Sequence, residues 1–255
     1  MIIRAQQMDE LTRLAQSSFE CEMVRHLQQF SARNCAVIGE PAVREIVALG
    51  TRRAQGCGFT NRGPVRFYLE SMFLFGSDFD TDPQYPWVRE ILTGEPIADQ
   101  TGRAECLYQR TVDYIAAVAG PGCQFEKDAI ERTSWWVRLE DPPSSAENLD
   151  NRILWRLESI YPQKCAYVGR AALEGLIGRA RQEAANHALG FARGIAVLAG
   201  LMFVFGHGCC TDPQFPWIAG TLRNTSIPDP VKTSERLFSK LKTYLESSQE
   251  LVEQR

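Results

Sequence analysis

The sequence has no long apolar run, only three histidines and no CxxC pair, and each of these absences excludes a class of protein. No apolar run approaches the length needed to cross a bilayer, which argues against a helical membrane protein. The first residues lack the charged start, apolar centre and cleavage site of a secretory signal, so we expect a cytoplasmic chain. The eight cysteines show no disulfide framework, which indicates thiols in or near the core.

The usual motifs of catalysis are also missing. The sequence contains neither the GxxxxGK[ST] loop that cradles phosphate nor the GxGxxG turn that binds dinucleotides. The segment "HGCC", from His207 to Cys210, offers three soft ligands, but no second ligand pair follows at a zinc-site spacing. A cysteine and histidine nucleophilic pair would need a third orienting group, and no pattern predicts one. We therefore expect no enzyme, no metal and no cofactor.

Three aspartates alternate in "DFDTDP" and resemble the start of a calcium loop. These are Asp78, Asp80 and Asp82. However, Pro83 stands where that loop requires glycine, and Arg89 stands where it requires a bidentate glutamate. The pattern therefore favours an exposed acidic patch over a metal site.

The most informative feature is an internal repeat. "MFLFGSDFDTDPQYPW" begins at Met72 and returns as "MFVFGHGCCTDPQFPW" from Met202, with ten of the sixteen positions identical. The same offset of 130 residues aligns apolar positions along most of the chain without a gap. The sequence thus predicts two copies of one module, at residues 1–120 and 149–255, joined by an ordered connector at 121–148.

Apolar residues recur at three- and four-residue steps, which is the period of a helix with one buried stripe. We expect an all-α fold of two pseudo-symmetric modules, with helices in the first near 6–30, 41–56, 63–75, 86–93 and 101–118. In the connector, Ser144 and Glu147 form a capping-box pattern that predicts the start of a helix.

The repeated segment is interpreted as a structural corner, in which a helix ends at a glycine and a proline-fixed turn leads into the next helix. Aromatic residues anchor this turn. The expected structural anchors are Gly76, Asp82, Pro83, Pro86, Trp87, Gly206, Asp212, Pro213, Pro216 and Trp217.

Charge differs between the two modules. Residues 1–150 contain 15 basic and 22 acidic side chains, whereas residues 151–255 contain 13 basic and 9 acidic ones. Drift on solvated faces would explain this difference, and so would selection for a basic partner of the acidic half, because surface charge governs encounter and partner choice. The weakly acidic whole lacks a basic stripe, which argues against direct nucleic-acid binding.

The repeated segment resembles a motif of small helical bacterial proteins associated with type VI secretion toxins, in which [MF]-F-x-F-G-x-D-F-D-x-D-P-x-x-P-W recurs. Met72 to Trp87 match this pattern closely, while the second copy lacks the aspartates at positions 208 and 210. The resemblance implies an immunity protein that neutralises its cognate toxin or, alternatively, an adaptor that loads an effector onto the secretion spike. Neither role implies a catalytic residue or membrane contact.

An immunity protein works by shape and charge complementarity, so acidic residues of the first 150 positions are candidates for contact with a basic toxin, for example a nuclease. The candidate partner-binding residues are Asp78, Asp80, Glu126, Asp128 and Glu131.

Overall fold

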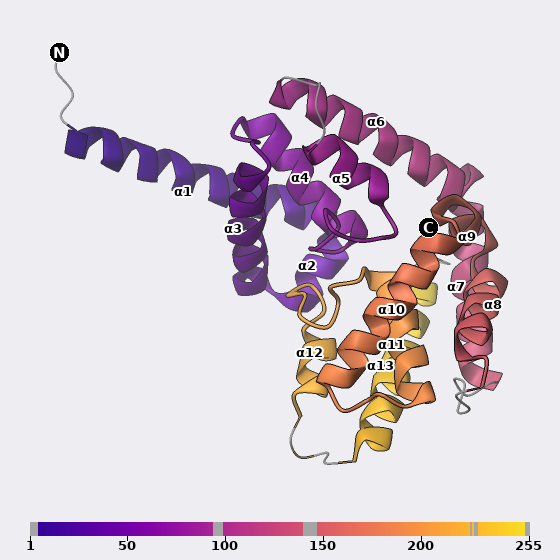
Figure 1. Cartoon of the computed structure of the whole chain (residues 1–255). Coiled ribbons are helices and arrows are strands. Elements are labelled where there is room, and N and C mark those ends of the chain that lie inside the picture. Colours follow the sequence, from indigo (N-terminus) through magenta and orange to yellow (C-terminus); the bar gives the residue numbers. More distant parts are fainter. Residues whose placement is uncertain (1–4, 94–98, 140–146, 225, 227–228, 253–255) are drawn as a thin grey trace.

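The chain is all helical. A computed structural model describes residues 5–93, 99–139, 147–224, 226 and 229–252, and these ranges contain helices but no strand (Figure 1). The expected all-α class is confirmed. The elements in chain order are α1 (Ala5–Phe30), α2 (Ala32–Ile38), α3 (Glu40–Gly56), α4 (Arg62–Phe75), α5 (Pro86–Thr93), α6 (Gln100–Ala119), a 3-10 turn (Pro121–Cys123), α7 (Gln124–Leu139), α8 (Leu149–Ile160), α9 (Pro162–Val168), α10 (Arg170–Asn186), α11 (Ala192–Phe205), α12 (Pro216–Leu222) and α13 (Pro230–Val252).

Prolines define the starts of the short helices. Pro86 is the first residue of α5, and Pro216 is the first residue of α12. Proline suits this position because its φ is already helical and because the first N–H of a helix has no partner within the helix. Phe215, before Pro216, is non-helical with φ −125° and ψ 58°, as expected for a residue that precedes proline.

The five helices expected in the first module are confirmed to within about one residue at each end. The short helix α2 and the connector helix α7 were not expected. The helix expected to start after Ser144 begins instead at Leu149, after Asn148 in a left-handed conformation with φ 50°. Ser144 itself lies outside the described residues. The sequence pattern was wrong here because Glu147 and Asn148 form a turn, and the helix begins at Leu149, whose side chain is buried.

The helix starts are spaced alike in the two parts of the chain. Helix α3 begins at Glu40 and α10 at Arg170, which is 130 residues later, and the same difference separates the starts of α2 and α9, α4 and α11, α5 and α12, and α6 and α13. We refer to α1–α6 as the first half and to α8–α13 as the second half.

Each half has its own buried apolar cluster. The first cluster runs from Phe19 to Val118, and the second runs from Leu149 to Leu241. Tyr161 packs against both clusters, and its hydroxyl donates a hydrogen bond to the carbonyl of Val118 at 3.1 Å. The two cores are therefore separate but adjoining. The expected boundaries at 120 and 148 stay a prediction.

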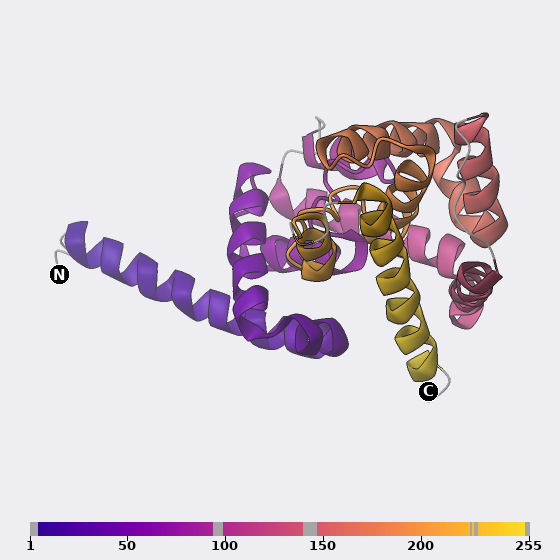
Figure 2. The ribbon, with the colours of Figure 1, turned by 90° about the horizontal axis from the view of Figure 1, so that it is seen from below.

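One helix extends beyond the body that the other helices form (Figures 1 and 2). The N-terminal turns of α1 project from the body in both views, whereas α7 packs against α13 and α8 at the opposite side of the molecule. Helix α6 leads from the first half to α7 and packs against α9 of the second half. No helix in the described ranges is long and apolar enough to cross a membrane.

Replacing Trp87 with alanine should lower the free energy of unfolding by about 3–5 kcal/mol, because this side chain is only 5% exposed and its ring lies 6.2 Å from that of Phe75. Denaturant titration measures the change. Trp155 is 64% exposed, so its alanine variant is the control and should differ by no more than about 0.5 kcal/mol. A Trp87 variant of unchanged stability would contradict the role of this residue as an anchor.

Candidate functional site

The two copies of the repeated segment face each other where the halves meet. Gly76 directly follows α4 and Gly206 directly follows α11, with φ of 97° and 90°. A Cβ on Gly76 would lie 2.5 Å from the carbonyl oxygen of Phe205, and one on Gly206 would lie 2.6 Å from that of Phe75. Glycine is therefore required at each position for two reasons, the positive φ and the close contact between the two backbones.

Two buried aspartates hold this contact, each by binding the backbone of the other half. Asp212 accepts hydrogen bonds from the amide and the hydroxyl of Ser77, both at 2.7 Å. Asp82 accepts one from the amide of His207, also at 2.7 Å. Asp212 and Asp82 are 2% and 3% exposed, so both carboxylates rely on these bonds for the partners that water would otherwise supply. We call the contact between residues 72–87 and 202–217 the junction.

Each aspartate also fixes its own turn. The amide of Gln84 donates to Asp82 at 2.8 Å, and the amide of Gln214 donates to Asp212 at 2.9 Å. This bond from an aspartate to the amide two residues on is the Asx turn that Asp-Pro sequences favour. Each carboxylate thus binds both its own corner and the opposite half.

The glutamines of the two corners cross the junction as well. Gln84 donates to the carbonyl of Met202 at 3.1 Å, and Gln214 donates to the carbonyl of Met72 at 2.7 Å. Both carbonyls also accept a hydrogen bond from the glycine that follows the helix, Gly76 or Gly206, at 3.0 Å, so each glutamine adds a second bond at a helix end. The junction therefore consists of pairs of contacts that recur with the halves exchanged.

A buried lysine makes the junction asymmetric. Lys164 on α9 is 6% exposed, donates to the carbonyl of Phe203 at 2.5 Å and lies 4.5 Å from the centre of that ring. Asn34 lies 130 positions earlier, and its amide donates to Gln214 at 3.2 Å. Burial lowers the pKa of Lys164 to about 8, and the carboxylate of Asp82 acts in the opposite direction.

Burial also raises the pKa of Asp212, and the hydrogen bonds from Ser77 and Gln214 act to lower it. A carboxylate and an ammonium group are thus both held away from water at the junction. The chemistry of this site is the binding of backbone amides and carbonyls, which fixes the position of one half relative to the other.

An aromatic cluster backs each corner. In the first half, the Phe75 ring lies 4.7 Å from Tyr85, 6.2 Å from Trp87 and 5.4 Å from Tyr114. In the second half, the Phe205 ring lies 4.6 Å from Phe215, 6.0 Å from Trp217 and 5.0 Å from Tyr244. These clusters tie the ends of α4 and α11 to the helices that follow each turn.

All ten expected anchors lie at or directly after the two turns of the junction. Trp217 is half-buried rather than buried, and Pro86 and Pro216 are exposed at the helix starts. The sequence did not single out Ser77, Gln84, Gln214 or Lys164. The glutamines could have been found, because they are identical in the two copies of the motif.

Of the five candidate partner-binding residues, two lie at the junction and are engaged within the chain. Asp78 pairs with Arg53 at 2.6 Å, and Asp80 accepts a hydrogen bond from the hydroxyl of Tyr68 at 2.8 Å. A Cβ on Gly208 would lie 1.8 Å from a carboxylate oxygen of Asp78, so the glycine at 208 leaves room for this aspartate.

The other three candidates lie on α7 and are separate from the first two. Glu126 and Glu131 are exposed, and Asp128 is half-buried and accepts a hydrogen bond from Gln124 at 2.6 Å. The structure thus divides the set between the junction and α7, and their partner-binding role stays a prediction.

The "HGCC" segment is part of the junction. The ring nitrogen Nε2 of His207 lies 3.1 Å from both the hydroxyl of Thr81 and the carbonyl oxygen of Asp78, and Cys209 and Cys210 are buried. Within the described ranges, no group of three or more histidine, cysteine or acidic side chains is placed to hold a metal ion.

Replacing Asp82 or Asp212 with alanine should lower the free energy of unfolding by about 1–3 kcal/mol, because each change leaves a buried backbone amide without its acceptor. Denaturant titration measures both. Asp113 is exposed on α6 and accepts only from Gln109 of the same helix, at 3.1 Å, so its alanine variant is the matched control. Equal, small losses in all three variants would show that the junction bonds contribute nothing.

The lowered pKa of Lys164 predicts that the stability of the fold depends on pH. The pKa of this lysine in the folded chain, about 8, lies below the ordinary value of 10.5, so the unfolded chain binds the proton more tightly. Stability should therefore rise with pH between these two values, and below about pH 8 the buried charge should be destabilising. The Lys164→Met variant has no such buried charge, so at about pH 8 and below its free energy of unfolding should exceed that of the natural chain. This difference should shrink as pH rises from about 8 to 10. An advantage independent of pH would contradict this assignment.

In comparisons with known proteins, no family model, curated protein or solved structure matches this chain.

Proposed function

We infer that the chain is a tandem duplication of one helical module, with its halves related by a pseudo-twofold relation. The equal spacing of the helix starts supports this inference. So does the reciprocity of the junction, in which Asp212 binds Ser77 while Asp82 binds His207. Contacts that recur with partners exchanged are typical of an interface between two copies of one unit.

We further propose that the protein binds another protein without chemistry of its own, as the cytoplasmic immunity protein of a type VI secretion toxin. One observation carries this proposal. The residues that give the chain its resemblance to toxin-associated proteins form the junction and are mostly buried there. They act as a scaffold, so the outer faces of the helices are free to differ and to select a partner.

Charge supports a basic partner for one part of this surface. Glu126 and Glu131 are exposed on α7, in the acidic first 150 residues. Acidic groups on an inhibitor pair with the basic cleft by which a nuclease holds its substrate, and they speed association. This face of α7 is therefore the proposed contact region for the toxin.

An effector adaptor is the second candidate. It is favoured by the exposed apolar side chains on the described surface, among them Leu74, Tyr108 and Val204 at 44%, 48% and 43% exposure. Apolar surface of this kind suits the capture of a partly unfolded effector segment.

Expression of the chain should protect cells that produce the toxin encoded beside it, and its deletion should leave export of that toxin intact. Survival and secretion assays measure the two outcomes. Loss of export without any protection would replace immunity with the adaptor role.

Charge reversal refines this experiment. In the double variant Glu126→Lys/Glu131→Lys, association with the toxin should slow by about tenfold or more, and the rate should depend less on salt. Glu90→Lys on α5 is the control, because Glu90 is also exposed and also lies in the acidic first 150 residues. Association that is equally fast in all variants would remove α7 from the interface.

A further inference from the structure

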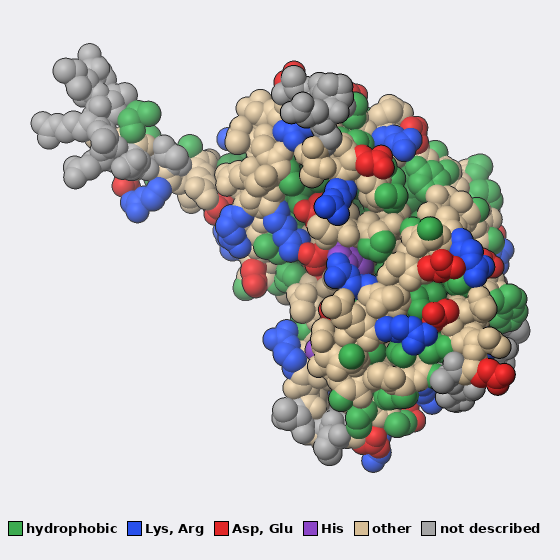
Figure 3. Space-filling model, viewed as in Figure 1, with side chains coloured by type: hydrophobic (Ala, Val, Ile, Leu, Met, Phe, Trp, Pro, Cys, Tyr) green, Lys and Arg blue, Asp and Glu red, His purple; other side chains and the backbone are tan. Residues whose placement is uncertain are grey.

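The outward face of α6 carries an exposed apolar stripe. Tyr108, Val112 and Ile115 are 48%, 40% and 38% exposed, and their spacing of four and three residues places them on one side of the helix. The ring of Phe67 on α4 meets that of Tyr108 edge-on at 5.5 Å, which extends the stripe toward the neighbouring helix. Hydrophobic side chains gather over the C-terminal end of α6 in Figure 3. We call this stripe the α6 face.

The corresponding helix of the second half is more covered. Helix α13 begins 130 residues after α6, and α7 packs against it. Phe238 and Lys242, which stand 130 positions after Tyr108 and Val112, are only partly exposed. The comparison rests on the inferred duplication. It indicates that a helix covers in the second half what the first half leaves open.

The sequence position of α7 identifies the missing helix. Helix α7 directly precedes α8, whose first residue, Leu149, stands 130 positions after Phe19 of α1. In chain order, the part of α1 that precedes Phe19 takes the place that α7 takes in the second half, although at the offset of 130 residues only residues 135–139 of α7 correspond to it, at residues 5–9. We call these N-terminal turns, residues 5–18, the arm.

The arm has the apolar stripe that such a helix needs. Met8, Leu11 and Leu14 are 51%, 54% and 59% exposed, and their steps of three residues place them along one side of the helix. The arm is about 20 Å long at 1.5 Å per residue, which is enough to lie along the α6 face. In Figures 1 and 2, however, it points away from the body of its own chain and from α6.

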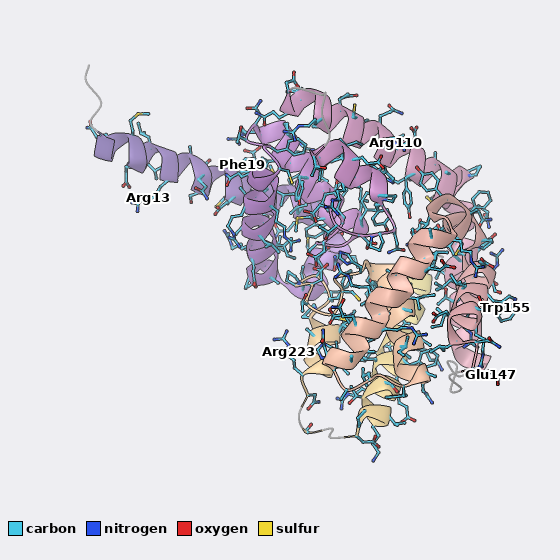
Figure 4. All side chains as sticks on the ribbon, viewed as in Figure 1. Arg13, Phe19, Arg110, Glu147, Trp155 and Arg223 are labelled. Atoms are coloured by element: carbon cyan, nitrogen blue, oxygen red, sulfur yellow. The ribbon has the colours of Figure 1, made fainter. Side chains whose placement is uncertain are left out.

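We propose that the arm packs on the α6 face of a second copy of this chain, and that two copies exchange arms to form a twofold dimer. Exchange of an identical element between two copies buries both apolar stripes at once and closes the assembly. Charges of both signs flank both stripes, because the arm carries the exposed pair Glu10 and Arg13, 2.8 Å apart, and α6 carries exposed Arg110 and Asp113. Figure 4 shows Arg13 on the arm and Arg110 on α6.

The purified full-length chain should be a dimer that dissociates on dilution, as measured by sedimentation velocity over a range of concentrations. The double variant Leu11→Glu/Leu14→Glu in the arm should raise the dissociation constant at least about tenfold, since each buried leucine contributes to the contact. Val112→Glu in the α6 face should act in the same direction. Trp155→Glu is the control, because Trp155 is exposed on α8, on another side of the molecule (Figure 4).

Mixing the two kinds of variant gives the sharpest test. In a mixture of the arm variant with the α6-face variant, the second copy supplies an intact arm and the first an intact face, so one of the two contacts can form. The mixture should therefore dimerise more tightly than either variant alone, by about tenfold or more. No simple loss of folding produces this rescue.

Three results would overturn the proposal. They are a chain that is monomeric at every concentration, a dimer that tolerates both kinds of variant, and a mixture that dimerises no better than its components. The test uses no toxin, so its failure leaves the proposed immunity role untouched. If instead Val112→Glu abolished toxin binding by a monomeric chain, the α6 face would belong to the toxin.

Discussion

The fold depends on the close approach of two backbones at Gly76 and Gly206, held by Asp82 and Asp212. Buried carboxylates are costly without partners, and here each obtains them from the opposite half. This arrangement makes the position of one half conditional on the other. The aromatic clusters behind Phe75 and Phe205 then carry that constraint into the two cores.

The junction and the outer helices have different roles. The residues of the junction are mostly buried and bind within the molecule, so differences between related proteins in partner choice would fall on the outer helices. Two such surfaces stand out. One is the acidic side of α7 with Glu126 and Glu131, and the other is the apolar α6 face with Tyr108 and Val112. Their different chemistry suits the two partners that we propose, a basic toxin for the first and a second copy for the other.

The helices of the first module could be predicted from the sequence because each has a buried stripe with a clear period, as in Val43, Ile46 and Val47 of α3. Helix α2 could not, because Cys35 is its only buried side chain. The anchors were predicted from local turn chemistry, but the partners of Asp82 and Asp212 were not. No local pattern encodes which backbone amide 125 or 135 residues away a carboxylate will meet. Lys164 was missed as well, because the repeat aligns it with the uncharged Asn34 and so gives no sign of a buried charge.

Hydrogen exchange at the amides of Ser77 and His207 tests the junction most directly. Both residues lie in turns outside the helices, so the acceptors that protect them are Asp212 and Asp82 of the opposite half. If the junction holds the halves together, both amides should exchange as slowly as those in the cores of α4 and α11, through global unfolding. Exchange as fast as in an exposed loop would contradict it.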